Sequence, residues 1–314
     1  MTILIQMLSM VVTFSVALLL ASLGEMFNQR SGIFNLGCEG IMAMGAFIGM
    51  LIPFSVGHGG NVSMVYYFLS FLAAAGLGAM LSLLFAVITV TFGAPQGIAG
   101  IGLQMFGVGL AGTLFRTFVG GTQSVPSVPA LRIPLLSKIP FIGPVFFSTN
   151  IVAYLAYIFV PVAWYILFKT PWGLKVRAVG THPRAADSMG INVNRTRYQA
   201  LELGGALGGI AGAYLSIVQA GMFSDTLISG RGFIAVALVY FGHWHPVQIL
   251  GGAVLFTFAQ TLQTVIQSLG ISFPYELLVM LPYVLVVVVL SFTSRNDTMA
   301  PSALGKPFNR EVRT

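Results

Sequence analysis

The sequence VYYFLSFLAAAGLGAMLSLLFAVITVTF (residues 65–92) contains no Asp, Glu, Lys or Arg, and it lies in a longer uncharged stretch between Glu39 and Arg116. An α-helix needs about 20 apolar residues to cross a bilayer, so this stretch has room for several crossings. Backbone polar groups in hydrocarbon must be bonded within their own segment, and the alternation typical of a membrane β-barrel is absent. The sequence therefore predicts an all-α transmembrane helical bundle.

The composition of the whole chain agrees with this class. Of its 314 residues, 56% are hydrophobic and only 7% are charged, whereas soluble proteins contain about 25% charged residues. A water-soluble surface cannot be built from these residues. The net charge is +7, but the basic residues do not form a continuous patch with interleaved aromatics, so a nucleic-acid partner is not expected.

About nine membrane spans are predicted, within a range of eight to ten. The first is expected to be a retained helix rather than a signal peptide, because no small-residue cleavage pattern follows it. The bundle would occupy residues 1–293, and a tail would follow over 294–314. The predicted spans are residues 3–23, 36–52, 65–92, 98–115, 151–168, 200–219, 232–242, 248–267 and 277–293.

The Lys and Arg residues predict the orientation, because they favour the cytoplasmic side. Six of them lie in residues 169–197, and four lie after Thr293. With nine spans the amino terminus is outside, and eleven basic residues face the cytoplasm against four outside. We therefore expect a cytoplasmic loop over 169–199, a cytoplasmic tail and carboxyl terminus, and an external loop, rich in Pro and Gly, over 120–150.

Sequence signatures of catalysis and nucleotide binding are missing. No G-x-x-x-x-G-K-[ST] motif occurs, and no nucleophile is paired with a base. The single cysteine, Cys38, excludes a disulfide framework within the chain. His243 and His245 would point in different directions on a helix, so no metal site is expected. The prediction is a protein that is not an enzyme and needs no cofactor.

The loop GLKVRAVGTHPRAADSMGINVNRTR (residues 173–197) is polar and basic, and it contains a short helical pattern. Pro183 fits the first turn of a helix, Ala186 favours its continuation, and Gly190 can end it. A short helix outside the membrane suits docking into a groove on a soluble partner. From physical chemistry alone, a solvated loop near anionic headgroups is an equal alternative.

This loop resembles the cytoplasmic coupling loop of permease subunits of ATP-binding-cassette (ABC) importers of the branched-chain amino acid, ribose and nucleoside class. Three other stretches are similar to the same family: GEMFNQRSGIFNLGCEGIMAMGAF (24–47), SGRGFIAVALVYFGHWHP (229–246) and ELLVMLPYVLVVVVL (276–290). The similarity extends in order along nearly the whole chain and leaves out mainly the external loop and the tail. The chain most resembles one of the two permeases of nucleoside importers that work with a basic-membrane-protein type binding lipoprotein.

The resemblance implies a transport subunit of the bacterial inner membrane that works by alternating access. Its implied partners are a separate ABC ATPase subunit, a second homologous permease in a heterodimer, an external solute-binding lipoprotein or periplasmic protein, and membrane lipid. The loop residues that would receive the movement of the ATPase are Pro183, Arg184, Ala185, Ala186, Asp187, Met189, Gly190 and Ile191.

A polar solute needs hydrogen-bonding and stacking groups on an otherwise apolar lining. Glu39 has three open readings: a hydrogen-bonded structural role, a contact with solute, or a proton relay. Each of the other candidates for the path could instead form an interhelical hydrogen bond or serve in packing. The candidates for the translocation path are Asn35, Glu39, Phe47, Gln104, Phe106, Gln219 and Gln260.

Glycines recur at spacings of four in the span that begins at Ala200, which places small residues on adjoining helix faces and favours close helix packing. These glycines are Gly204, Gly205, Gly208, Gly209 and Gly212.

Other transport functions stay open at this point. Permeases for ribose, another simple sugar, autoinducer or riboflavin are relatives of the same type. An ion-coupled secondary transporter, with Glu39 as the coupling group, is a second alternative. A membrane-embedded enzyme is disfavoured, because the spans offer no paired catalytic groups.

Overall fold

The computed structural model describes residues 2–57, 62–121, 123–131, 139, 142–268, 275–293 and 300–309. Within these residues nearly all regular structure is helical, which confirms the predicted class. Pairing between extended segments in the same residues is limited to two isolated bridges, Ser124 with Met222 and Ala130 with Asn150. The prediction for the external loop falls partly on residues 132–138, which lie outside the described residues.

Each of the nine predicted spans coincides with a helix. The helices are α1 (Thr2–Arg30), α2 (Cys38–Val56), α3 (Met64–Ala86), α4 (Gln96–Phe118), α5 (Ile142–Phe146), α6 (Ile151–Lys169), α7 (Pro171–Thr181), α8 (Pro183–Ser188), α9 (Val193–Tyr214), α10 (Arg231–Phe241), α11 (Pro246–Ser268) and α12 (Tyr275–Thr293). α3 and α9 each continue into a short π-helix, Val87–Thr91 and Leu215–Ala220.

The described helices do not confirm the predicted number of spans. Among the described residues, seven helices are long and apolar enough to cross a membrane: α1, α2, α3, α4, α6, α9 and α11, with α3 and α9 counted together with their π-helices. α10 has only 11 residues, about half the length that a crossing requires. α12 has 19 residues, most of them apolar, and is not among the seven. The count of about nine is therefore not confirmed.

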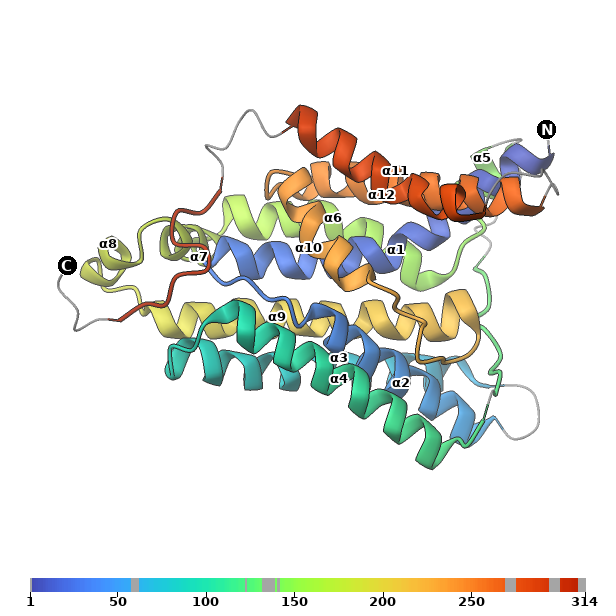
Figure 1. Cartoon of the computed structure of the whole chain (residues 1–314), viewed down its shortest axis with the longest axis horizontal. Helices are drawn as coiled ribbons and strands as arrows, with labels where there is room; N and C mark the ends of the chain where they lie inside the picture. The colour runs from blue at the N-terminus through green and yellow to red at the C-terminus, as the bar shows by residue number, and fades with distance from the viewer. Residues whose placement is uncertain are drawn as a thin grey trace.

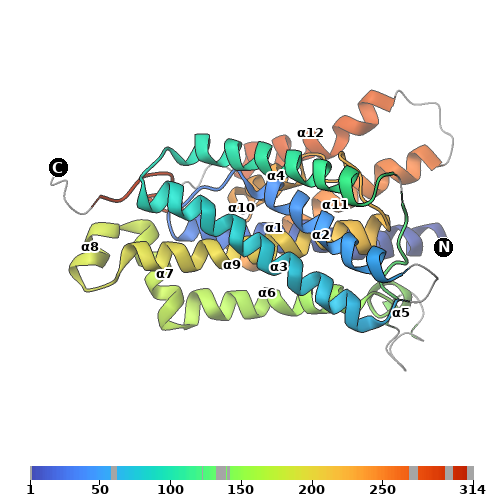
Figure 2. The ribbon, with the colours of Figure 1, turned by 90° about the horizontal axis from the view of Figure 1, so that it is seen from below.

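Helix α9 lies at the centre of the bundle. It packs against α1, α2 and α3, while α4 covers α2 and α11 covers α1 (Figure 1). The two ends of the bundle differ: α7, α8 and residues 300–309 gather at one end, and the start of α1 and α5 lie at the other (Figure 2).

Glycines let α9 approach its neighbours backbone to backbone. A Cβ atom added to Gly209 would lie 2.0 Å from the carbonyl oxygen of Ala74 in α3, and one added to Gly212 would lie 1.9 Å from that of Met42 in α2. Side chains larger than hydrogen do not fit at such distances. The other members of the predicted glycine set face different neighbours: Gly204 faces Asn28, Gly205 faces Gly78 and Ser82, and Gly208 faces Ile41.

Candidate functional site

Two helices begin inside the bundle rather than at its ends. α1 ends at Arg30, and residues 31–37 are non-helical before α2 begins at Cys38. α10 likewise follows non-helical residues, 221–230. The two starts meet, since a Cβ atom on Gly232 would lie 2.5 Å from the backbone nitrogen of Glu39. Helix amino termini carry unbonded N–H groups and partial positive charge, and transport proteins use such discontinuous helices to bind polar solutes.

Glu39 links these two helix starts. Its residue is only 7% exposed, and its Oε1 accepts a hydrogen bond of 2.7 Å from the backbone N–H of Gly230. Gly230 has a φ of +81°, a left-handed conformation that glycine adopts without strain. The second carboxylate oxygen, Oε2, is buried and has no hydrogen-bonding partner among the described residues. A buried carboxylate oxygen without a partner is costly, so it marks a candidate contact for a solute donor.

A second buried carboxylate, Glu25, was not selected from the sequence. It is 1% exposed and accepts hydrogen bonds from Asn28 Nδ2 (2.8 Å), Gln29 Nε2 (3.2 Å) and the backbone N–H of Asn35 (3.1 Å). Asn35 was predicted to line the path. Its Oδ1 accepts a hydrogen bond from the Gly37 N–H at 2.9 Å, where the chain leads into α2.

The far end of α10 is tied to the end of α1. The indole nitrogen of Trp244 donates to Gln29 Oε1 at 2.8 Å. Arg30 Nη2 in turn donates to the carbonyl oxygen of Trp244 at 3.0 Å. His243 and Trp244 have φ values of +46° and +55°, so the chain turns sharply here. α10 is therefore held at both ends, by Glu39 at its start and by the end of α1 after its last turn.

A polar cavity of about 490 Å³ lies between α10, α11 and α12. Its polar lining includes Gln260 and Gln263 from α11, Arg231 at the start of α10, and Tyr283 from α12. Small-molecule sites span about 300–1,000 Å³, so this cavity could hold a solute of nucleoside size. Gln260 is the predicted path residue that lines it.

The remaining path candidates are dispersed through the bundle. Phe47 is buried and packs edge-on against Phe223, with ring centroids 6.3 Å apart. Gln219 Nε2 donates to the carbonyl oxygen of Phe14 at 3.0 Å, which is the interhelical hydrogen bond considered as its alternative role. On α4, Gln104 is half-buried and Phe106 is exposed. The structure therefore does not bring the seven candidates together at one site.

The loop between α6 and α9 folds into two helices. Thr170 caps α7 by accepting a hydrogen bond from the Gly173 N–H at 3.1 Å, and Asn192 caps α9 by accepting from the Arg195 N–H at 2.9 Å. Between them, α8 starts at Pro183 and Gly190 follows it with a φ of +80°. This confirms the predicted short helix; α7 was not predicted as a separate helix, although Thr170 and Pro171 form a typical start signal.

Helix α8 has an inner and an outer face. Ala186 is buried in a small apolar cluster with Val179 and Val193, against which Ile191 and Phe308 pack. Met189, by contrast, is 82% exposed. Of the other predicted coupling residues, Arg184, Ala185 and Gly190 are exposed, and Pro183 and Asp187 are half-buried. The loop thus presents a protruding tip on a packed base.

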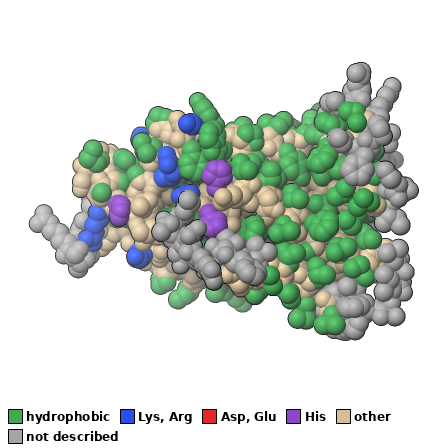
Figure 3. All heavy atoms as spheres, turned by 90° about the horizontal axis from the view of Figure 1, so that it is seen from above, with side chains coloured by type: hydrophobic (Ala, Val, Ile, Leu, Met, Phe, Trp, Pro, Cys, Tyr) green, Lys and Arg blue, Asp and Glu red, His purple; other side chains and the backbone are tan. Residues whose placement is uncertain are grey.

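Basic side chains gather at the α7–α8 end. In the view of Figure 3, Lys and Arg lie at this end of the molecule, while the remainder of the visible face is dominated by hydrophobic side chains. The same end holds Lys169, Lys175, Arg177, Arg184 and Arg195. Lys and Arg favour the cytoplasmic side of a membrane protein.

The chain belongs to the family described as branched-chain amino acid transport system / permease component, which matches residues 7–290. It is therefore a multi-pass membrane protein and a transport component rather than an enzyme.

Individual relatives are similar over nearly their full lengths. The guanosine ABC transporter permease protein NupQ of Bacillus subtilis is 38% identical, over 97% of this chain and 98% of the relative. The nucleoside ABC transporter permease protein NupC of Lactococcus lactis is 37% identical, over 93% of each chain. The putative glucose ABC transporter permease protein TsgC13 of Haloferax volcanii is 33% identical, over 98% of each chain. No solved structure matches the chain significantly.

Proposed function

We propose that this chain is the membrane-spanning permease subunit of a bacterial ABC importer for nucleosides, which it moves by alternating access. The observation that carries the proposal is the near full-length similarity to guanosine and nucleoside permeases at 38% and 37% identity. The two helix starts that meet at Glu39 support it, because they place a polar site within an otherwise apolar bundle.

The proposed topology has nine membrane segments, with the amino terminus outside. α12 would be the last full crossing, and α10 would reach only part of the way, from Gly230 beside Glu39 to Trp244 beside Arg30. The end that carries α7, α8 and residues 300–309 would face the cytoplasm, as its basic residues favour. Residues 120–150 would form the external loop.

The proposed solute path runs past Glu39 and the cavity that Gln260 lines. Nucleosides carry ribose hydroxyls and base N–H groups, which donate hydrogen bonds. Glu39 Oε2 offers an acceptor without a partner, and Gln260, Gln263 and Tyr283 offer both donors and acceptors. Glu39 is thus assigned a contact with solute in addition to its bond to Gly230.

The proposed complex contains an ABC ATPase subunit, a second related permease in a heterodimer, and an external solute-binding protein. α8 would dock on the ATPase, with Met189 at its exposed tip and Arg184 beside it. Residues 294–314 would form a cytoplasmic tail, of which residues 294–299 and 310–314 lie outside the described residues.

Uptake of labelled guanosine tests the function. In a strain that lacks this chain, uptake should be lost; it should return when the chain is supplied again, and unlabelled adenosine should compete. Competition by glucose or ribose, with none by nucleosides, would assign the permease to simple sugars, and competition by riboflavin alone would assign it to that vitamin. Accumulation driven by a proton or sodium gradient in vesicles that hold this chain alone would establish a secondary transporter.

A further inference from the structure

Residues 300–309 fold back onto the coupling loop. The backbone N–H of Ala303 donates to the carbonyl oxygen of Gly180 at 3.0 Å, and that of Gly305 donates to Gly32 at 3.1 Å. Ser302 Oγ also bonds to the carbonyl oxygen of Thr181. The segment is thus bonded both to the end of α7 and to the chain that leads from α1 into α2.

A side chain of this segment supports α8 from beneath. Phe308 packs against Val179, Ala186 and Val193, which come from α7, α8 and α9. Phe308 thus adds an aromatic side chain to the apolar base of the loop. Residues 300–309 are therefore part of the folded coupling surface.

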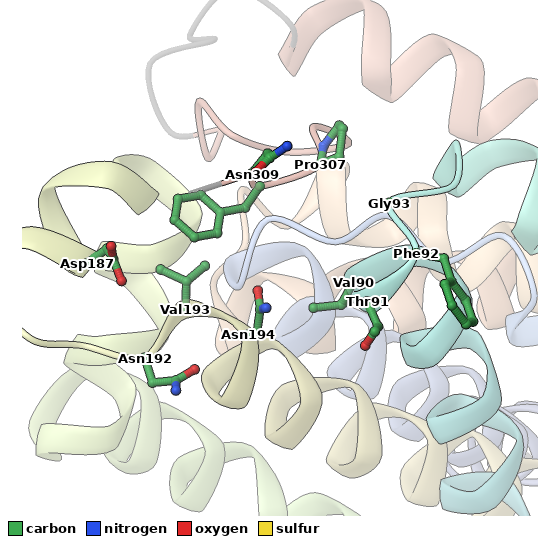
Figure 4. Close-up of a pocket in the computed structure, with 11 residues that line it drawn as sticks. Val90, Thr91, Phe92, Gly93, Asp187, Asn192, Val193, Asn194, Pro307 and Asn309 are labelled. Carbon is green, nitrogen blue, oxygen red and sulfur yellow. The ribbon is translucent and has the colours of Figure 1, made fainter. Parts of the chain in front are cut away.

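A polar groove of about 570 Å³ lies beside this segment. Figure 4 shows its three walls: Pro307 and Asn309 from the tail, Asp187 from α8 with residues 192–194 at the start of α9, and residues 90–93 at the end of the π-helix that follows α3. Phe92 on the third wall is 77% exposed. The groove thus joins three segments that are far apart in the sequence.

We infer that this groove receives a polar loop of the ATPase subunit, so that residues 301–309 form one wall of the ATPase docking surface. The inference rests on the proposed function, and it adds a second contact to the one that α8 makes. Through this segment, movement of the ATPase would be transmitted to the interior of the bundle, because the tail is also bonded to Gly32 in the chain that leads to Glu39.

The charge of the lining favours a protein loop over lipid. Among the residues of 2–309 that the structure describes, the groove lining includes no Lys or Arg, and neutral amides and hydroxyls such as Asn192, Asn194 and Thr91 supply most of its polar groups. Anionic headgroups are attracted by basic clusters, and the described lining residues form none. Neutral amides and hydroxyls instead suit polar side chains of a protein partner, such as Ser or Asn.

The test fills the groove without changing the tail. Asn194 is exposed on its lining, so Asn194→Trp should place an indole where the ATPase loop would enter. Leu174→Trp is the matched control, since Leu174 is exposed on α7 and does not line the groove. The measurements are the amount of ATPase that copurifies with the full complex, nucleoside uptake, and the amount of chain in the membrane.

Asn194→Trp should lower the copurified ATPase and the uptake by about tenfold or more, at an unchanged amount of chain in the membrane. Leu174→Trp should match the wild type. As a second variant, Phe308→Ala should weaken ATPase binding, and Phe308→Leu should restore most of it, because leucine keeps an apolar side chain under α8.

Full ATPase recruitment by Asn194→Trp would overturn the inference. So would a variant that changes only the adsorption of the complex to phosphatidylglycerol vesicles, which would assign the groove to lipid. Failure of the proposed function is distinguishable, because the wild-type complex itself would then neither recruit an ATPase nor support nucleoside uptake.

Discussion

Glu39 Oε1 lies 2.7 Å from the backbone nitrogen of Gly230, and this hydrogen bond joins the start of α2 to the start of α10. The two residues are far apart in the sequence, and each lies at a helix start inside the bundle. A change at either position would act on both helices.

Glu39→Gln should separate the structural role of this side chain from its contact with solute. The amide oxygen still accepts the bond from Gly230, so the amount of chain in the membrane should stay near that of the wild type. Uptake should fall by roughly tenfold, because the group in place of Oε2 becomes an NH2, which donates and cannot accept a hydrogen bond from the solute, and a hydrogen bond to a charged acceptor contributes about 1.5–3 kcal/mol. Unimpaired uptake by this variant would restrict Glu39 to a capping role.

Gly209→Ala should destabilise the bundle. Its new methyl group would lie 2.0 Å from the carbonyl oxygen of Ala74, a backbone atom that no side-chain rotation can move away. Overpacking of this kind costs about 1–3 kcal/mol. Gly76→Ala on α3 is the control, since no atom lies within 4 Å of its added Cβ. Thermal unfolding in detergent should show a lower midpoint for the first variant alone; equal midpoints would contradict the close packing of α9 on α3.

Met189→Glu should impair coupling while leaving the fold intact. Met189 is 82% exposed at the tip of α8, so the change removes no internal packing. An apolar anchor replaced by a charge at the centre of an interface typically weakens binding by more than about 2 kcal/mol. Nucleoside-stimulated ATP hydrolysis by the assembled complex should therefore drop, whereas the unfolding temperature should not. A stable complex with normal stimulation would remove α8 from the docking surface.

Trp244→Phe should loosen the attachment of α10 to α1. The change leaves Gln29 Oε1 without its buried donor, which costs about 1–3 kcal/mol. Trp172→Phe makes a fair comparison, because it removes a hydrogen bond of 3.0 Å to Gln199 that lies in an exposed position. We expect a clear loss of thermal stability in the first variant and a small one in the second; the reverse order would argue against the tie between α10 and α1.

Much of the helical architecture was predictable, because uncharged length alone identifies segments that must form helices in a membrane. The helix over 183–188 was also predictable, since Pro183 and Gly190 are local signals that act without tertiary contacts. The count of nine is not confirmed at α10, whose 11 residues are apolar but fewer than a full crossing needs. Hydropathy does not reveal that a helix starts inside the bundle rather than at its end.

The polar site was only partly predictable. Glu39 stands out as an isolated acid in an apolar segment, but Glu25 is followed by Asn28, Gln29 and Arg30 and reads as part of an ordinary polar helix end. Its role arises from Asn35, which returns to it only because residues 31–37 fold back into the bundle. The docking of residues 300–309 likewise depends on contacts between residues that are far apart in the sequence, such as Phe308 and Ala186. No local sequence pattern encodes such contacts.

The buried position of Cys38 has a practical consequence for spectroscopy. It is the single cysteine of the chain, and it is enclosed where α2 begins. A thiol-reactive fluorophore or spin label should therefore leave the native protein almost unmodified and react at a cysteine introduced on the surface. Distances between labels at Met189 and at the opposite end of the bundle could then be followed through the transport cycle in an otherwise unaltered sequence.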